Sequence, residues 1–317
     1  MSAIVLGVGA SHSTLMNTHW DEVDHLPAAH DFRDGLRHAA AAIAAAEPDV
    51  VVVIGSNHFR GLFLDLMPSI TVGVAEVIGA GEADTPSGQL PVDRALAKHL
   101  VDELVANSFD PAFSLRLTVD HGVTHGLQHL VPGLDVPIVP IVLNMFAPPL
   151  IPLARAESIG HALRAAVASD GADKRVVVIA SGGLSHHLPW PDWSATLSDD
   201  DRFLVEAWLN GREQWKDFEV RRRQIIRAAT ARINPPFDAD FLSQLVNGDL
   251  SRTIAKSSDE IEKEAGNGAQ EIRSWIAMVA AVGAGRGTTL AYSPVEEWLT
   301  GMAVALYQPL DGQDETS

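Results

Sequence analysis

The chain of 317 residues carries 41 acidic and 23 basic residues, a formal net charge of −18 at pH 7. This charge argues against nucleic acid or an anionic membrane surface as a partner, because both attract clustered lysine and arginine side chains. The absence of cysteine excludes disulfides, thiolate nucleophiles, iron–sulfur clusters and cysteine-ligated zinc, so any bound metal has nitrogen and oxygen ligands. No apolar run is long enough to span a bilayer and the N-terminus does not resemble a secretion signal, which indicates a cytoplasmic protein.

The first part of the chain alternates strand and helix patterns. Residues 3–9 and 50–54 are short, β-branched apolar runs typical of buried strands. The alanine-rich segment 34–47 between them predicts a helix that Pro48 ends, and a strand–helix–strand order favours a parallel pair. The polar segment 17–30 is expected to be a surface loop that could overhang a site.

The alternation continues to residue 190 and then gives way to helices. Further strands are predicted at 114–119, 137–143 and 176–179, and helices at 91–106, 154–169, 199–210, 220–233, 237–247 and 269–284. We therefore expect one α/β domain over residues 1–317, with a mainly parallel central sheet flanked by helices and a mainly helical C-terminal third. Residues 311–317 are expected to be a frayed tail.

Four of the strand-like runs are each followed closely by a histidine: His12, His58, His121 and His186. One histidine at a strand end is more often a hydrogen-bonded turn or core residue than a ligand. If the four strands run parallel in one sheet, however, their carboxyl ends converge on one edge, where open α/β folds place their sites. The four histidines therefore predict a shared metal or acid–base site.

Two more histidines follow His121 at a spacing of four residues. A helix would place His121, His125 and His129 on one face, a spacing that can bind zinc. The segment lacks the glutamate of the HExxH motif, however, and Gly122 and Gly126 argue against a rigid helix. We expect His121 to be functional, and His125 and His129 to be structural or supporting.

The predicted histidine site suits one kind of metal chemistry. Two neutral imidazoles and one carboxylate on one face of a metal leave three adjacent positions open, the arrangement used by non-haem Fe(II) oxygenases. A vicinal diol could chelate through two of these positions and leave one for dioxygen. Further histidines could move protons, because an imidazole with a pKa of about 6.5 both accepts and gives a proton near neutrality. The spacing does not identify the carboxylate.

Motifs along nearly the whole chain resemble those of one enzyme family. They are SHS at 11–13, NHFRGLFLDLMP at 57–68, VDHG at 119–122, SGGLSHH at 181–187, NPPFDADFL at 234–242 and EAGNGAQEIRSWIA at 264–277. VDHG and SGGLSH in this order are the most specific. The chain is thus similar to the class III extradiol ring-cleavage dioxygenases, the superfamily of the protocatechuate 4,5-dioxygenase catalytic subunit.

The resemblance implies roles for five residues. Carried over by motif, His12, His58 and Glu271 would hold Fe(II) as the cofactor. His186 would accept a proton from the bound catechol, and His121 would donate a proton as the ring opens. On its position alone, Glu271 is also explained as a glutamate in the first turn of a helix, stabilised by the helix dipole.

The resemblance also implies the substrates: O2 and a catechol whose 3-substituent ends in a carboxylate, 2,3-dihydroxyphenylpropionate or 2,3-dihydroxycinnamate. In a chain this acidic the carboxylate needs a local cation, and arginine can hold it through two charge-assisted hydrogen bonds. Arg60, two residues after His58, is the expected substrate-binding residue, with a solvated surface arginine as the alternative. We also expect a homo-oligomer.

Two other functions stay open on the sequence. A zinc-dependent hydrolase could use the same two histidines and one glutamate, with a further histidine assisting an activated water. A non-catalytic member of the same superfamily could keep the fold and bind a peptide or protein. Retention of all five proposed active-site residues argues against the second alternative.

Overall fold

The computed structural model describes residues 1–191 and 196–310. Its strands are β1 (Ala3–Ala10), β2 (Val50–Gly55), β3 (Ile70–Ala80), β4 (Ser87–Leu90), β5 (Ala112–Val119), β6 (Ile138–Leu143), β7 (Arg175–Ser181), β8 (Gly285–Val295) and β9 (Thr300–Pro309). Its longer helices are α3 (Pro27–Ala45), α4 (Arg94–Ala106), α5 (His121–Leu130), α6 (Leu153–Ser169), α7 (Asp199–Asn210), α8 (Trp215–Arg227), α9 (Pro235–Asn247), α11 (Ser258–Ala265) and α12 (Ile272–Val282). Short helical segments are α1 (Thr14–Thr18), α2 (Trp20–Val23), α10 (Ser251–Ile254), η1 (Glu82–Asp84), η2 (Asn267–Glu271) and η3 (Glu296–Trp298).

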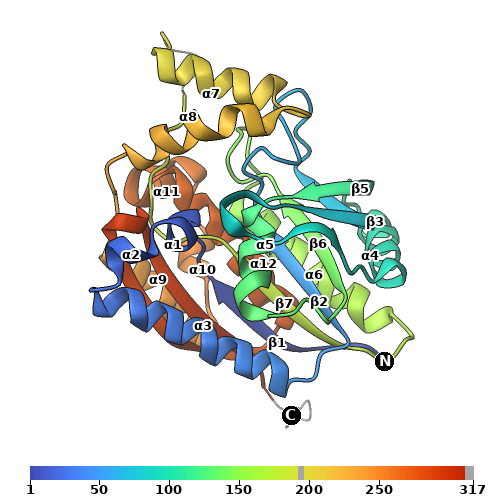
Figure 1. Ribbon diagram of the computed structural model, residues 1–317. Helices are drawn as coiled ribbons and strands as arrows, with labels where there is room; N and C mark the ends of the chain where they lie inside the picture. The colour runs from blue at the N-terminus through green and yellow to red at the C-terminus, as the bar shows by residue number, and fades with distance from the viewer. Residues whose placement is uncertain (192–195, 311–317) are drawn as a thin grey trace.

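The strands form one sheet in the order β4-β3-β6-β2-β7-β1-β9-β8, with β5 paired to β3. The central strands β6, β2, β7 and β1 run parallel, whereas β9 and β3 pair antiparallel on either side of them. Helices cover both faces of this sheet (Figure 1). The predicted α/β fold is confirmed, while the single domain over residues 1–317 stays a prediction.

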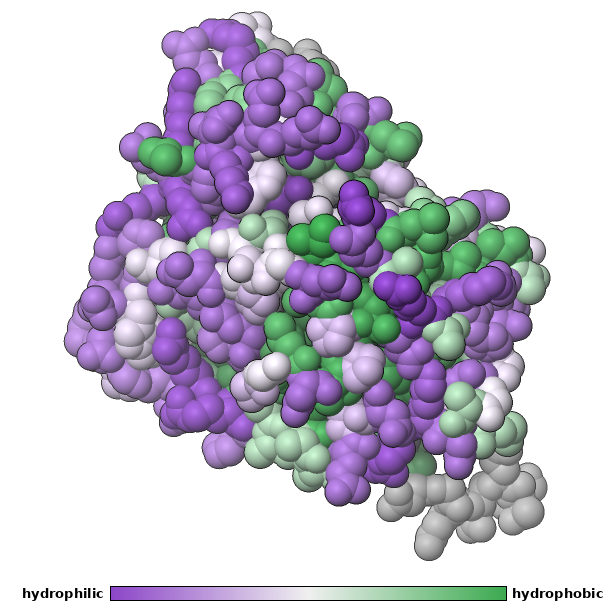
Figure 2. All heavy atoms as spheres, turned by 45° about the vertical axis from the view of Figure 1, so that its right-hand side comes forward, coloured by the Kyte–Doolittle hydropathy of each residue, from purple (hydrophilic) through white to green (hydrophobic). Residues whose placement is uncertain are grey.

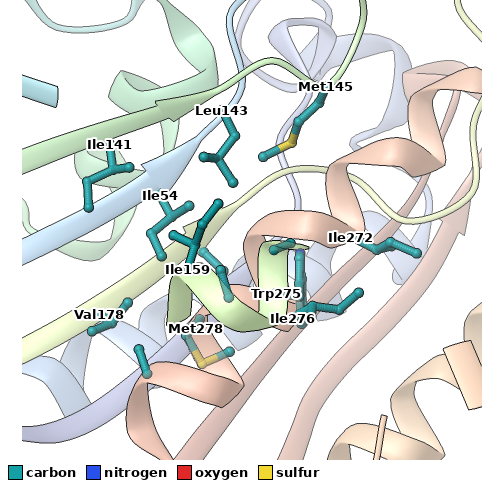
Figure 3. Packing of buried hydrophobic residues seen from close by; sticks show 14 of the residues in the cluster. Ile54, Ile141, Leu143, Met145, Ile159, Val178, Ile272, Trp275, Ile276 and Met278 are labelled. Carbon is teal, nitrogen blue, oxygen red and sulfur yellow. The ribbon is translucent and has the colours of Figure 1, made fainter. Parts of the chain in front are cut away.

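The central strands are apolar throughout because both of their faces are buried. Val52 and Ile54 of β2 belong to the core beside α6 and α12, and Val51 and Val53 belong to the core beside α3, as expected for side chains that alternate across a sheet. Figure 3 shows the first of these cores, in which Trp275 and other apolar side chains of α12 pack with strand residues. The helices thereby fix the strand ends that carry the site.

Segment 17–30 is not the predicted loop. Ser13 caps α1 by accepting a hydrogen bond from Leu15 N, and Pro27 occupies the first turn of α3, which starts earlier than the predicted segment 34–47. Apolar residues of this region, including Met16, are buried. The prediction was wrong because the many polar residues of this segment suggested a loop. They lie on the exposed sides of helices whose other sides are buried.

Residues 121–130 form α5, although Gly122 and Gly126 argued against a rigid helix here. Asp120 caps this helix by accepting from Gly122 N at 3.1 Å. A Cβ atom at Gly122 would lie 2.3 Å from Ser56 O, so the glycine allows the first turn of α5 to approach the chain after β2. The cost of glycine in the helix is offset by this close contact.

The C-terminal third is mainly helical, as predicted, but it ends in an antiparallel hairpin that the sequence did not reveal. β9 lies between β1 and β8, and its residues 300–305 are all buried. A continuous apolar run of this length has no period that distinguishes a strand from a helix. The predicted frayed tail, residues 311–317, lies outside the described residues.

The surface is largely hydrophilic, with apolar side chains gathered on the side that bears β3 and β5 (Figure 2). Phe113 and Leu115 of β5 are 63% and 67% exposed. No helix in the described part of the chain is long and apolar enough to cross a membrane. The expected homo-oligomer stays a prediction.

Candidate active site

The structure brings the four predicted histidines together. The ring of His12 lies 5.2 Å from that of His58 and 5.3 Å from that of His121, and the rings of His58 and His121 stack at 3.9 Å between their centroids. Nε2 of His186 lies 3.9 Å from Oε2 of Glu271. The other carboxylate oxygen of Glu271, Oε1, contacts His12 and His58. All five side chains are buried.

The route by which His121 reaches the site differs from the one predicted. His12, His58 and His186 follow the parallel strands β1, β2 and β7, as expected. β5 instead pairs parallel with β3, which is antiparallel to β6, so β5 runs against the central strands. His121 enters the site as the first residue of α5, whose amino end packs beside the end of β2.

Glu271 is the carboxylate at the centre of the cluster. Its Oε1 lies 3.3 Å from His12 Nε2 and 3.7 Å from His58 Nε2, and it accepts a hydrogen bond from Ser56 Oγ. Its Oε2 accepts from Gly183 N at 2.7 Å. Burial alone would raise the pKa of Glu271, but the neighbouring imidazoles, with His12 first among them, lower it to about 2. The glutamate is therefore ionised near neutral pH.

The backbone leaves room for this glutamate at Gly182. Gly182 has φ +151°, and a Cβ atom there would lie 2.6 Å from the Cβ of Glu271. Glycine adopts this backbone angle without the strain that an L side chain would meet. The glycines after β7 therefore let Glu271, on η2, approach the strand end.

The donor atoms fit a divalent metal. His12 Nε2 is buried and has no hydrogen-bond partner in the described part of the chain, and ring nitrogens of His12, His58 and His121 lie within 4.8 Å of one another. Together with the carboxylate of Glu271 they make a nitrogen and oxygen donor set suited to iron or zinc. The geometry also places His121 near enough to be a ligand.

The Nδ1 side of the His12 and His58 rings is held by a polar group. His12 Nδ1 lies 3.0 Å from Ser181 Oγ, and His58 Nδ1 lies 3.4 Å from a carboxylate oxygen of Asp120. Asp120 also accepts from the backbone N of His58 at 2.6 Å. Partners of this kind orient histidine ligands and fix which ring nitrogen is free to bind a metal.

His186 presents a proton acceptor. Its Nδ1 donates to the carbonyl oxygen of Leu184 at 2.9 Å, so in the neutral imidazole the lone pair lies on Nε2. Burial lowers the pKa of His186 below its ordinary value, although Glu271 opposes this effect. Asp238 steadies the same loop, because it accepts from Ser185 N at 2.8 Å and from Ser185 Oγ at 2.6 Å.

A cavity of about 270 Å³ opens onto the four histidines. Its aromatic walls include Phe59, Phe146, Trp190 and Trp208. The rings of Trp190 and Trp208 stack at 4.4 Å, and that of Phe146 lies 4.9 Å from His58. A cavity with apolar walls and a few polar groups at one end is typical of a small-molecule site, and a single aromatic ring suits these walls.

Arg60 lines the cavity, so the alternative of a solvated surface arginine is wrong. Its Nη2 donates to both carboxylate oxygens of Glu219, at 2.9 and 2.8 Å, and its Nη1 donates to His58 O at 2.7 Å. An internal carboxylate thus occupies one side of the guanidinium. Binding of a substrate carboxylate by Arg60 stays a prediction.

The two remaining histidines of α5 lie behind the site. The ring centroid of His125 is 6.2 Å from that of His12 and 4.7 Å from that of His129. Among the described residues that line the cavity, neither His125 nor His129 occurs. Their expected supporting role stays a prediction.

The model of the family described as "Catalytic LigB subunit of aromatic ring-opening dioxygenase" matches residues 6–303. The chain belongs to this family. Its membership confirms the predicted enzyme class, a ring-opening dioxygenase, and the relatives do not support a hydrolase or a non-catalytic protein.

Named relatives of this LigB-family dioxygenase are similar over most of their length. A protein of Rhodococcus sp and one of Rhodococcus jostii (strain RHA1), both named 2,3-dihydroxyphenylpropionate/2,3-dihydroxicinnamic acid 1,2-dioxygenase, are each 34% identical over 95% of this chain and 97% of their own. A protein of Dechloromonas aromatica (strain RCB) with the same name, numbered 1, is 34% identical over 85% of this chain and 88% of its own. A solved structure of the uncharacterized protein JW3007 from Escherichia coli K12 is 17% identical, with a TM-score of 0.47, over 95% of this chain and 99% of that one.

The dioxygenase site also contains a carboxylate that the sequence analysis missed. Glu82 is buried, and its Oε1 accepts from His121 N at 2.6 Å and lies 2.8 Å from His121 Nδ1. Burial raises the pKa of Glu82 to about 7, and the nearby Asp120 carboxylate adds to this effect. The flanking loop is strained, since Ala83 and Asp84 have φ +52° and +59°. Only the glycine-rich context of Glu82 could have drawn attention to it.

Glu82 is therefore expected to position the His121 ring. Glu82→Leu removes the acceptor and should lower kcat by about 10- to 100-fold, the range found for groups that orient active-site histidines. Glu82→Gln keeps an oxygen that can accept from His121 N, and we expect it to recover part of the rate. Steady-state kinetics of both variants would measure this. Equal losses in the two variants would contradict a role that depends on the accepting oxygen.

Proposed function

We propose that the protein is an Fe(II)-dependent extradiol dioxygenase that uses O2 to open a catechol ring next to its two hydroxyls. We further propose 2,3-dihydroxyphenylpropionate or 2,3-dihydroxycinnamate as the catechol, the compounds in the names of the relatives. The observation that carries the proposal is the convergence of His12, His58 and Glu271 on one point at the end of an aromatic cavity.

In this proposal the residues divide into a metal-holding group and a proton-moving group. His12, His58 and Glu271 would hold Fe(II) on one side, which leaves the side toward the cavity for ligands. Bound Fe(II) would supply the redox chemistry that lets a catechol react with dioxygen, both atoms of which end in the ring-opened product. The proton transfers would be carried out by side chains of the protein, His186 and His121.

His186 is the proposed base. Its Nδ1 hydrogen is held by Leu184 O, so Nε2 is free to take the proton of a catechol hydroxyl that enters between the aromatic walls. The lowered pKa of His186 keeps the ring neutral, and so able to accept, before the catechol arrives.

His121 is the proposed acid. Its ring lies 5.3 Å from that of His12 and 3.9 Å from that of His58, and its Nδ1 contacts Glu82 at 2.8 Å, which fixes the ring. Burial lowers the pKa of His121 well below its ordinary value, so its resting ring is neutral. The Glu82 carboxylate at Nδ1 would favour an imidazolium that forms during turnover, and that imidazolium can give its proton at Nε2 to the oxygen released as the ring opens.

Metal reconstitution tests the proposal. The metal-free protein is loaded under anaerobic conditions with Fe(II) or, in parallel, with Zn(II), and is then given 2,3-dihydroxyphenylpropionate in air-saturated buffer. We expect the Fe(II) form to consume one O2 per catechol and to form a yellow ring-opened product, and the Zn(II) form to do neither. Oxygen-electrode traces and absorbance spectra measure both results. Oxygen uptake that does not depend on Fe(II) would refute the proposed cofactor.

A further inference from the structure

Four arginines line the cavity, and one of them has no carboxylate partner. The lining arginines are Arg60, Arg222, Arg223 and Arg227. The last three lie on α8, which with α7 forms the upper part of the molecule in Figure 1. They give the cavity a cationic side in a protein whose net charge is strongly negative.

Three of the four arginines contact a carboxylate within the chain. Arg60 binds both oxygens of Glu219, and Nε of Arg223 donates to the same carboxylate at 2.9 Å. Arg227 forms an ion pair with Glu22. One carboxylate, Glu219, is thus shared between two guanidinium groups, which leaves this side of the cavity with excess positive charge.

Arg222 is the exception. Arg222 is only 3% exposed. Even so, no carboxylate of the described residues lies within 4.0 Å of its guanidinium nitrogens. Its one hydrogen bond in the described part of the chain runs from Nη2 to His58 O, at 2.9 Å, and its Nε has no partner. A guanidinium carries five N–H donors, so most of this group is unused.

An unused, buried guanidinium indicates a missing anion. Burying a charge without a partner is costly, and structures normally pair such a group or bind a ligand to it. Burial lowers the pKa of Arg222 to about 9, so the group is still cationic near neutral pH. A carboxylate matches the planar fork of a guanidinium and can accept two parallel hydrogen bonds from it.

We propose that Arg222 binds the carboxylate at the end of the substrate side chain, and so selects catechols whose 3-substituent is acidic. The inference rests on the proposed function and deepens it. His58 joins the two ends of the substrate site, because its carbonyl oxygen binds Arg222 while its ring faces Glu271. Arg60, with Nη2 on Glu219, would shape this end of the cavity and hold Glu219 away from the ligand.

Turnover of two matched catechols tests the proposal. 2,3-Dihydroxyphenylpropionate and 3-propylcatechol have side chains of similar length, and only the first ends in a carboxylate. Arg222→Met should lower kcat/KM for the acid by about 10- to 150-fold, the loss expected for a hydrogen bond to a charged group, and leave 3-propylcatechol nearly unchanged. The matched control is Arg221→Met, the adjacent residue of α8, which is exposed and pairs with Asp200. Arg221→Met should leave kcat/KM unchanged for both catechols.

Binding to the metal-free protein gives a second readout that needs no turnover. Calorimetric titration with 3-phenylpropionate and with its neutral analogue 3-phenyl-1-propanol should show tighter binding of the acid by wild type and loss of that preference in Arg222→Met. Arg222→Lys keeps a cation near His58 O and should retain part of the preference, which provides a folded variant if the methionine variant is unstable.

Each result has a defined meaning. An equal loss of kcat/KM on both catechols would overturn the proposal, because it would assign Arg222 a purely structural role, and so would an unchanged preference for acids. If the Fe(II) form of wild type turns over no catechol at all, the proposed function fails, whereas the titrations with the two phenylpropyl compounds still decide the role of Arg222.

Discussion

Replacing His12 or His58 by alanine is expected to lower the affinity for Fe(II) by more than about 100-fold and to abolish ring opening with it. Loss of a group that only orients a metal ligand costs about 10- to 100-fold in metal affinity, so loss of the ligand itself should exceed the upper end of that range. Metal content after reconstitution, measured by a chelator assay, and oxygen uptake would report the two effects. The remaining imidazole and Glu271 would be too few to hold the ion.

Exposed histidines provide the control for this experiment. His38 of α3 and His161 of α6 are exposed, and neither lines the described cavity. Alanine at either position should leave metal content and turnover at wild-type values. If His12→Ala keeps full iron occupancy and turnover, His12 is not a ligand, and His121, which has a ring nitrogen within 4.8 Å of ring nitrogens of His12 and His58, becomes the alternative.

His186→Gln and His121→Gln are expected to impair different proton transfers. Glutamine has no titrating group at the position of either imidazole, and loss of a general acid or base costs about 10²- to 10⁴-fold in rate. His186→Gln should weaken formation of the deprotonated catechol complex, because Nε2 is the atom free to accept a proton. His121→Gln should still bind and deprotonate the catechol but open the ring slowly.

Anaerobic titration separates these two effects from each other. Catechol is added to each Fe(II)-loaded variant without oxygen, and the absorbance of the deprotonated catechol is recorded before oxygen is admitted. We expect a full signal in His121→Gln and a reduced signal in His186→Gln, with slow product formation in both. Wild-type rates in both variants would leave the two histidines with structural roles only.

The histidines were predictable from the sequence because each follows a short apolar run, and a strand end is a position that the sequence marks well. His12, His58 and His186 reach the site by that route. His121 also lies in the site, but the assumption that its strand runs parallel to the others was wrong. β5 runs against the central strands, and α5 places His121 beside the other histidines. Pairing between distant strands depends on packing that local sequence does not record.

Other parts of the site were hidden because their role depends on distant contacts. Glu82 and Arg222 lie far apart in the sequence and in segments without a recognisable motif, and each becomes notable only through its burial and its partners. Glu271 was reached through resemblance to a family, since its place beside a helix start is explained equally well by the helix dipole. Arg60 was placed at the cavity, but its bond to Glu219 could not be foreseen.

The hairpin at the end of the chain determines when the site can form. β9 pairs with β1, and its residues also bind the loops that carry His12 and His186. Ala303 exchanges hydrogen bonds with Ser11, and Gly301 exchanges them with Leu184 and Ser185. Until β9 is inserted between β1 and β8, the segments that bear His12 and His186 lack these bonds. β9 follows all four histidines and Glu271 along the chain, so the bonds that support the His12 and His186 segments can form only after every residue of the candidate site has been synthesised.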